Sequence, residues 1–313
     1  MATKTDGTCY FLGGSSVDLI LEMNHIPLPD EKVLAQFSGM QAGGLVSNTA
    51  CAAARLGLPS AWAGVVGDDE GGRLVLSEFE RFGVDASYTQ ILPGARSDFC
   101  VIMLDSSRER TILVVETTKG MPDLTPALLD QLECARLVYV TPQKQALYAS
   151  IAETVHRGGG QMAIDVEAGN ALNAQELDFC ISNADIVFTN RAALERRAAG
   201  ANLEEGARHW LNMGASLVIA TLGAAGAAAF RQGETRSQPG YIVPVTDTTG
   251  AGDCFHAAFL FGLLSGYSLD DALVFSNAAA ALSVQKLGAR PGLPNIEQVR
   301  AFLAGNPLTT KID

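Results

Sequence analysis

The sequence predicts an α/β fold: a doubly wound, mostly parallel sheet with helices on both faces, and a small β-sheet lid. Two observations predict the sheet. From residue 137 onward, short apolar runs alternate with segments of helical spacing, and glycine turns follow several of these runs. Two stretches, about 18–43 and 97–118, predict the lid because they interrupt this alternation with strand-like sequence. No linker or internal repeat separates these parts, so residues 1–313 are expected to form one domain.

Composition and charge exclude several classes of protein. Hydrophobic residues make up 48% of the chain and charged residues 18%, which is typical of a globular protein and not of a disordered one. The net charge of -12 argues against a broad basic face, so no nucleic-acid partner is expected. The six cysteines form no CxxC pair and are expected to be reduced thiols of a cytoplasmic protein. No apolar run is long enough to span a membrane, so no membrane partner is expected.

The first third of the chain is expected to contribute elements to both the main sheet and the lid. A short buried strand at 9–14 ends in glycines, and Asp18 follows it at the edge where open α/β sheets bind ligands. A turn or cap role fits Asp18 equally well. Further elements are expected as a lid strand at 32–37, a helix at 49–57 stopped by Gly57, a buried strand at 61–66 and a helix at 73–82.

Two groups of polar residues in this part could bind ligands. Gly43 and Gly44 allow a ligand to approach the backbone closely, and Asn48 in the following turn could either cap the helix or hydrogen-bond a polyol. The acidic run 68–70 could hold a metal. Acidic residues also suit a helix N-terminus, and we favour that role.

From residue 97 the sequence predicts a hairpin and then regular βα units. The apolar runs 99–104 and 111–115 flank a polar turn, which is typical of a hairpin. Strands of the βα units are expected at 137–140, 162–165, 186–189 and 217–220, and helices at 145–157, 173–182, 191–199 and 203–213. Because parallel strands end at one edge of the sheet, Asp165, Asn190 and Thr221 are expected near Asp18 at the ligand-binding edge.

The stretch 246–255 carries the clearest chemical signal. Gly250, Ala251 and Gly252 form a glycine turn that opens an apolar helix at 251–265. The free amides and the dipole of such a helix start attract an anion. Asp253 follows directly, and a carboxylate there is a plausible general base beside a phosphoryl acceptor.

The rest of the C-terminal part is less specific. Thr221-Leu222-Gly223-x-x-Gly226 is a second glycine turn, which alone requires no ligand. Helices are expected at 269–287 and 295–303. Asn277 lies on an apolar face of the first, where a buried amide with satisfied hydrogen bonds is the ordinary explanation.

Four landmarks in this order resemble one family. The run Asp247-Thr248-Thr249-Gly250-Ala251-Gly252-Asp253 resembles the second signature of the ribokinase-like (PfkB) carbohydrate kinases, and Gly43-Gly44-x-x-x-Asn48 resembles the first. Gly67-Asp68-Asp69-x-x-Gly72 and Thr221-Leu222-Gly223-x-x-Gly226 are similar to further landmarks of that family. One glycine turn is an unspecific feature. Four landmarks that occur in family order and cover nearly the whole chain are specific to the family.

This resemblance implies an ATP-dependent sugar kinase that uses Mg²⁺, with Asp253 as the base and the amides of Gly250, Ala251 and Gly252 as an anion hole. It assigns acceptor binding to Asp18, Gly43, Gly44, Asn48 and Arg110, and nucleotide binding to Asn190, Thr221, Gly223, Gly226 and Asn277. It further implies a monovalent cation, K⁺, held near Asp247, Thr249, Ser283, Lys286, Gly288 and Gly292.

Three departures from the family pattern bear on specificity. Ribokinases proper carry Gly-Gly-Lys-Gly-Ala-Asn where this chain has Gly-Gly-Leu-Val-Ser-Asn at 43–48, which weakens the case for ribose. A glutamate that often positions Mg²⁺ is replaced by Ala193, and Glu195 could substitute only if its helix shifts. Arg110 could face the acceptor or the solvent.

The acceptor expected from the residues is a pentose, a ketohexose or a related polyol. A nucleoside kinase is the alternative within the family, although the lid offers only Phe37 and Phe99 to stack a base. A non-catalytic sugar-binding regulatory protein is the alternative from another class. A dinucleotide oxidoreductase is disfavoured because no GxGxxG follows the first strand. The apolar faces of the lid strands predict a homodimer that pairs through the lid.

Overall fold

The computed structural model describes residues 7–106, 110–167, 172–197 and 202–306. Its main sheet has eight strands in the order β14-β13-β12-β11-β10-β9-β1-β4. The strands are β1 (Cys9–Leu12), β4 (Ser60–Ala63), β9 (Leu137–Val140), β10 (Gln161–Val166), β11 (Ile186–Asn190), β12 (Leu217–Thr221), β13 (Ala227–Arg231) and β14 (Glu234–Gln238). All pair in parallel except β13 and β14, which confirms the predicted doubly wound sheet.

Helices cover both faces of this sheet. They are α1 (Leu45–Leu56), α2 (Glu70–Phe82), α3 (Pro126–Cys134), α4 (Gln145–Arg157), α5 (Ala174–Ser182), α6 (Arg191–Arg197), α7 (Leu203–Met213), α8 (Ala251–Leu264), α9 (Leu269–Ser283) and α10 (Ile296–Gly305). Side chains alternate along each strand, so Phe11 packs in the core under α1, α8 and α9, while its neighbour Leu12 packs in the core under α3, α4, α5 and α7. The two buried layers explain why the parallel strands are apolar throughout.

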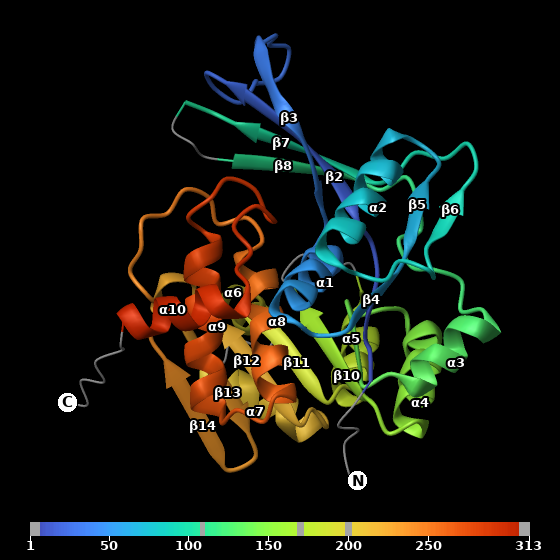
Figure 1. Ribbon diagram of the computed structural model, residues 1–313, viewed down its shortest axis with the longest axis vertical. Coiled ribbons are helices and arrows are strands. Elements are labelled where there is room, and N and C mark those ends of the chain that lie inside the picture. Colours follow the sequence, from blue (N-terminus) through green and yellow to red (C-terminus); the bar gives the residue numbers. More distant parts are fainter. Residues whose placement is uncertain (1–6, 107–109, 168–171, 198–201, 307–313) are drawn as a thin grey trace.

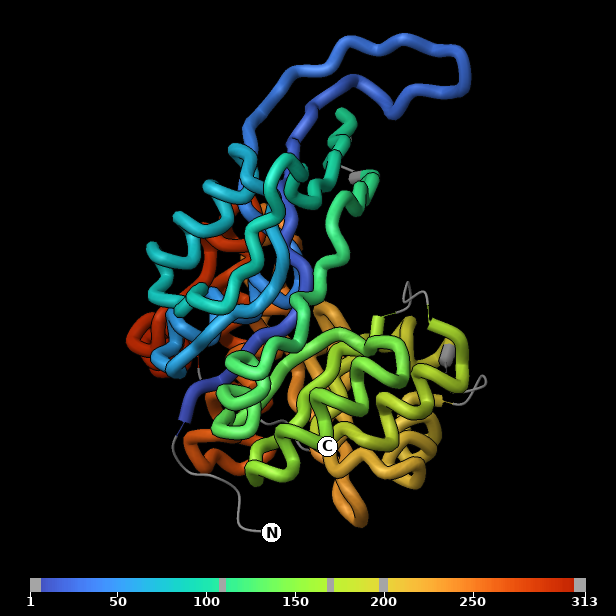
Figure 2. Tube along the Cα trace, turned by 90° about the vertical axis from the view of Figure 1, so that its right-hand side faces the viewer, coloured from blue at the N-terminus to red at the C-terminus, as the bar shows by residue number. Residues whose placement is uncertain are grey.

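The lid is a separate sheet with the order β3-β2-β7-β8. Its strands are β2 (Ser16–Met23), β3 (Ala35–Gly43), β7 (Phe99–Leu104) and β8 (Arg110–Val115). Strand β2 pairs antiparallel with β3 and parallel with β7, so two segments far apart in the chain form one sheet. The sheet stands above the body in Figure 1, and the β2–β3 hairpin, in blue, reaches away from it in Figure 2.

Several element boundaries differ from the expected ones. Asp18 does not lie in a turn after the first strand, because only three residues separate β1 from β2, which carries Asp18 into the lid. The helix expected at 49–57 starts four residues earlier, at Leu45, and the one expected at 269–287 ends at Ser283. β6 (Gln90–Leu92), α3, β13 and β14 were not expected, since short or polar segments carry little periodic signal.

The strand expected at 61–66 is two strands in different sheets. β4 belongs to the main sheet, whereas β5 (Val65–Gly67) pairs with β6 in a sheet of two strands. Gly64 lies between them. A Cβ atom at Gly64 would stand 2.1 Å from the Trp62 ring and 2.4 Å from the carbonyl oxygen of Gly13, so only glycine fits where the chain changes sheet.

The acidic run at 68–70 starts a helix, as favoured above. Asp69 is the N-cap of α2 and accepts hydrogen bonds from the Gly72 amide at 2.9 Å and from the Ser97 hydroxyl at 2.7 Å. Within the described residues, no group of three or more His, Cys, Asp or Glu side chains could hold a metal ion. Nor does any helix of the described chain have the length and apolarity needed to cross a bilayer.

We expect Gly64→Ala to lower the free energy of unfolding by about 1–3 kcal/mol, because overpacking forces Trp62 or the backbone at Gly13 to move. Urea unfolding would measure the loss. Gly305→Ala is the matched control, since Gly305 is exposed at the end of α10 and a Cβ there meets nothing within 4 Å. Equal losses in the two variants would contradict this account of Gly64.

Candidate active site

The first turn of α8 forms the centre of the site. Gly250, its N-cap, has φ 74°, and a Cβ there would lie 2.8 Å from the Ala289 side chain, so the turn requires glycine. The Gly252 and Asp253 amides lie in the first turn of α8, where backbone N–H groups have no acceptor within the helix. The Ala251 amide donates to the Thr248 carbonyl at 3.2 Å, so this member of the predicted anion hole is already engaged by the turn. A Cβ at Gly252 would meet nothing within 4 Å, which leaves open space in front of the turn.

Asp253 is held by a residue from the other signature. Asn48 lies in the first turns of α1 and donates from Nδ2 to Asp253 Oδ2 at 2.9 Å. Its own Oδ1 accepts from Arg290 Nε at 2.9 Å. Asn48 is buried and does not cap its helix, whose N-cap Gly44 has no side chain to offer. The structure therefore joins the two predicted signatures through one amide.

The surroundings change the acidity of Asp253. Burial raises the pKa of its carboxyl to about 7, against the lowering effect of the Asn48 hydrogen bond and of the Arg290 charge. Glu167 and Asp18 add to the rise, because each brings a further negative charge. Asp253 is thus poised to exchange a proton near neutral pH.

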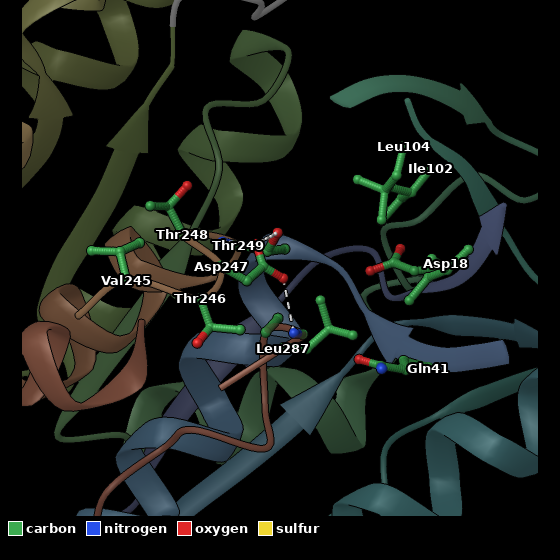
Figure 3. Close-up of a pocket in the computed structure, with 13 residues that line it drawn as sticks. Asp18, Gln41, Ile102, Leu104, Val245, Thr246, Asp247, Thr248, Thr249 and Leu287 are labelled. Atoms are coloured by element: carbon green, nitrogen blue, oxygen red, sulfur yellow. Dashed lines mark hydrogen bonds between the residues drawn. The ribbon is translucent and has the colours of Figure 1, made fainter. Parts of the chain in front are cut away.

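A cavity of about 450 Å³ lies between the lid and the loop that precedes α8. Figure 3 shows Asp18, Ile102 and Leu104 on the lid side, opposite Asp247 and Thr249. Burial raises the pKa of the Asp18 carboxyl, although the Ser16 hydroxyl donates to it at 3.3 Å. The cavity combines a few polar groups with aliphatic walls, which suits a small polar molecule with an apolar side.

The glycine pair at 43–44 fits against Asp18. A Cβ at Gly43 would lie 2.4 Å from Asp18 Oδ2, and a Cβ at Gly44 would lie 2.9 Å from the backbone of Ser15 and Ser16. Gly44 also has φ 97°. These glycines are therefore needed to let Asp18 and the first turn of α1 approach each other.

A second cavity, of about 270 Å³, adjoins the first through Val245 and Thr248, which line both. Four of the five residues assigned to the nucleotide line it: Thr221, Gly223, Gly226 and Asn277. Asn277 donates from Nδ2 to the carbonyls of Gln238 and Pro239, so its amide shapes the wall of this cavity. The anion-hole residues Ala251 and Gly252 line the same cavity, and the turn therefore faces it.

Some of the residues assigned to a monovalent cation lie close to one another. Asp247 accepts from the Thr249 amide and hydroxyl through Oδ1 and from the Gly288 amide through Oδ2. A Cβ at Gly292 would lie 2.1 Å from the Ser283 carbonyl oxygen, so these two backbones also touch. Lys286 is exposed. A carboxylate with carbonyl oxygens nearby is the kind of donor set that hard cations prefer.

Two predicted ligands lie elsewhere. Asn190 is absent from both cavities, and its Oδ1 accepts from the Ala193 amide at the start of α6. Glu195 is exposed on α6, with its Oε1 4.0 Å from Arg191 Nη1, so the helix has not shifted to bring it inward. Arg110 pairs through its backbone with Leu104, and its side chain lies outside what the structure describes.

Asp165, expected at the ligand-binding edge, is buried below it. Tyr139 lies 3.0 Å from His256 Nδ1 and donates to Asp165 Oδ2 at 3.4 Å, and all three side chains are buried. Burial lowers the pKa of His256 to about 3, so its ring is neutral. These groups pack α8 onto β9 and β10.

Sequence reasoning missed Arg290 and the lid residues Gln41, Ile102 and Leu104. The sequence carried one weak signal for Arg290, a single charged residue inside the apolar loop 287–294. For the lid residues the sequence carried no such signal. Which side chains of β3 and β7 face the cavity depends on how these strands pair with β2.

Comparisons with known proteins agree with this geometry. The family model described as pfkB family carbohydrate kinase matches residues 9–296. A ribokinase from Arabidopsis thaliana is 29% identical over 93% of this chain and 80% of its own length, and one from Haemophilus influenzae is 27% identical over 95% of this chain and 98% of its own. A solved structure of Arabidopsis thaliana ribokinase, complexed with ribose and ATP, matches with a TM-score of 0.85 at 26% identity, over 97% of this chain and 99% of that one.

We expect Asp253→Asn to stabilise the fold at alkaline pH. The unfolded carboxyl ionises near its ordinary pKa of 3.8, whereas the folded one keeps its proton up to about 7, so the native protein loses stability as pH rises between these values. Asparagine cannot ionise, so the variant escapes this loss. Its gain over the native protein should grow from pH 4.5 to pH 8 by up to a few kcal/mol, at about 1.4 kcal/mol per pKa unit.

Urea unfolding at the two pH values measures that gain, and Asp178→Asn, exposed on α5, is the control. The same gain at both pH values would contradict a raised pKa at Asp253.

Proposed function

The chain belongs to the pfkB family of carbohydrate kinases, and from that membership we propose that it transfers the γ-phosphoryl group of ATP to a primary hydroxyl of a pentose, a ketohexose or a related polyol. One observation carries the proposal: the helix start that bears Asp253 borders the second cavity through Ala251 and Gly252, with open space in front of Gly252, and that cavity adjoins the first. The curated relatives named above are ribokinases, which use ATP and a sugar.

Each part of the site has a role in this reaction. The Asp253 carboxylate takes the proton of the acceptor hydroxyl as its oxygen attacks the γ-phosphorus, and the bond to ADP breaks. The amides of Gly250 and Gly252 stabilise the charge on the transferred phosphoryl group, whereas the Ala251 amide is engaged by the Thr248 carbonyl. Asp18, which lines the first cavity, binds the acceptor together with Gly43, Gly44 and Asn48, which contact Asp18, Ser15, Ser16 and Asp253. Thr221, Gly223, Gly226 and Asn277 bind the nucleotide. A base with a pKa near 7 works best near neutral pH.

A sugar fits the acceptor cavity better than a nucleoside. The described residues that line it include the carboxylate of Asp18 and the amide of Gln41 but no aromatic ring on which a base could stack. A non-catalytic binding protein would not need an amide that holds Asp253 in place.

We infer that Mg²⁺ arrives with the phosphates of ATP and that Glu167, not Glu195, is the carboxylate available to its water shell. Glu167 follows β10 and acts electrostatically on Asp253, whereas Glu195 is exposed beside Arg191. For K⁺, the Asp247 carboxylate and the backbone at Ser283, Gly288 and Gly292 supply suitable oxygens. Bound there, K⁺ would supply positive charge beside the anion hole.

We also propose a homodimer that pairs through the lid, in a reducing cytoplasmic setting. Neighbouring residues Ile112 and Leu113 point to opposite faces of β8 and are 43% and 53% exposed. Phe37 on β3 and Val114 add further exposed apolar surface. All six cysteines are free thiols, which fits a reducing compartment.

A coupled ADP-release assay across pentoses, ketohexoses, sugar acids and nucleosides tests the function. Preferred phosphorylation of a neutral sugar supports it. Preference for a nucleoside would replace the proposed acceptor, and binding of a sugar with no ADP release would favour the non-catalytic alternative.

We expect Asp253→Asn to lower kcat by at least about 10²-fold, a typical contribution of a general base, while ATP binding stays near normal. Steady-state kinetics and ATP titration measure the two effects. Asp178→Asn, on α5 and outside the lining of both cavities, should retain normal turnover. Normal turnover in the Asp253 variant would refute its assignment as the base.

The lid dimer predicts twice the 32.9 kDa chain mass by light scattering at micromolar concentration. Val114→Lys places a charge on the exposed lid face and should shift the mass toward the monomer. Ile91→Lys, at an exposed position outside the lid sheet, should leave the dimer intact. A monomeric native protein would contradict the interface.

A further inference from the structure

Arg290 is a buried cation for which the phosphoryl-transfer scheme above has no use. It lies in the loop between α9 and α10, is only 3% exposed, and forms no ion pair within 4.0 Å among the described residues. Its Nη1 has no hydrogen-bond partner. A buried charge without a carboxylate in contact costs free energy, so its place in the fold requires an explanation.

The guanidinium is fixed on three sides behind the acceptor site. Nε donates to Asn48 Oδ1 at 2.9 Å, and Nη2 donates to Ser47 Oγ at 3.0 Å and to the Gly43 carbonyl at 3.3 Å. The ring of Phe79 lies 5.7 Å from its central carbon. These contacts leave the guanidinium one orientation, and each hydrogen-bonded residue belongs to the turn that opens α1.

The bond from Nε decides which way the Asn48 amide faces. An asparagine amide has an oxygen that accepts and a nitrogen that donates, and a flip by half a turn exchanges them. Arg290 only donates, so it holds Oδ1 on its own side and directs Nδ2 toward Asp253. With the amide reversed, two oxygens would face each other across that gap and the carboxylate would lose its donor.

We propose that Arg290 is a positioning residue of the active site, which fixes the Asn48 amide and thereby keeps the Asp253 carboxylate aimed at the acceptor. This rests on the proposed function only for the identity of the reaction. The charge of Arg290 acts in the same direction as its geometry, because it lowers the pKa of Asp253 and of Asp18. The other titratable groups that face Asp253 are Glu167, Asp18, Asp165, Tyr139 and Cys254.

Two variants separate charge from geometry. Arg290→Gln removes the charge, and Arg290→Lys keeps it without the rigid fork of donors. We expect both to lower kcat roughly 10- to 100-fold, since misplacing a catalytic group by about 1 Å can cost 10²-fold. ATP affinity should stay within about twofold, because Arg290 does not line the nucleotide cavity.

The pH profile distinguishes positioning from simple support of the fold. Asp253 works when ionised, so activity rises with pH through its pKa. Loss of the positive charge raises that pKa, and the acidic limb of kcat/KM should move to higher pH by about 1 unit in Arg290→Gln and by less in Arg290→Lys, which keeps the charge. An unchanged limb and unchanged kcat in the glutamine variant would overturn the proposal.

A second readout does not depend on turnover. Carbon-13 NMR of Asp-labelled protein, with Asp253→Asn to assign the signal, reports the titration of Asp253 directly. A shift of its midpoint to higher pH in Arg290→Gln supports the proposal even if no tested acceptor is phosphorylated, and an unmoved midpoint overturns it. If the glutamine variant does not fold, the lysine variant must still lower kcat, and wild-type kcat in it overturns the proposal. Lack of ADP release by the native protein would refute the proposed function alone.

Discussion

The hydrogen bond from Asn48 to Asp253 links two helices separated by about two hundred residues of chain, and the site depends on it. Helix α1 brings the turn that we propose binds the acceptor, and α8 brings the proposed anion-binding turn and Asp253, the proposed base. The two helices pack against each other on one face of the sheet, so the core that buries their apolar sides also fixes this contact. Packing of α1 against α8 thus fixes Asn48 and Asp253 relative to each other.

Charge limits how such a site can be built on an acidic chain. Asp18, Glu167 and Asp253 gather at one edge, although like charges repel and burial penalises each of them. Burial raises the pKa values of all three carboxyl groups, and nearby negative charges add to the rise at Asp18 and Asp253. The fold offsets it with helix-start amides and one buried guanidinium, which together supply positive potential without a broad basic surface.

Much of the body could be predicted because helices such as 145–157 and 203–213 carry a strong period and clear stops, and both match the structure. The glycine turns at 223–226 and 250–252 could also be recognised from the sequence, because only glycine tolerates the backbone angles and contacts of Gly226 and Gly250, and both turns lie beside one cavity. Asp18 and Arg290 could not be placed. The first depends on whether a strand continues into the lid, and the second on a loop that folds back onto α1, and neither is encoded in local sequence.

The lid carries a consequence for how this enzyme could be redesigned. The described lining of the nucleotide cavity comes entirely from residues 221–284, whereas the acceptor cavity draws Asp18, Gln41 and Ile102 from strands near the start of the chain. The lid side of the proposed acceptor cavity is therefore encoded in stretches of sequence that the proposed nucleotide cavity does not use, although Val245 and Thr248 line both. Libraries of variants confined to β2, β3 and β7 can therefore change the acceptor specificity while the lining of the nucleotide cavity stays the same.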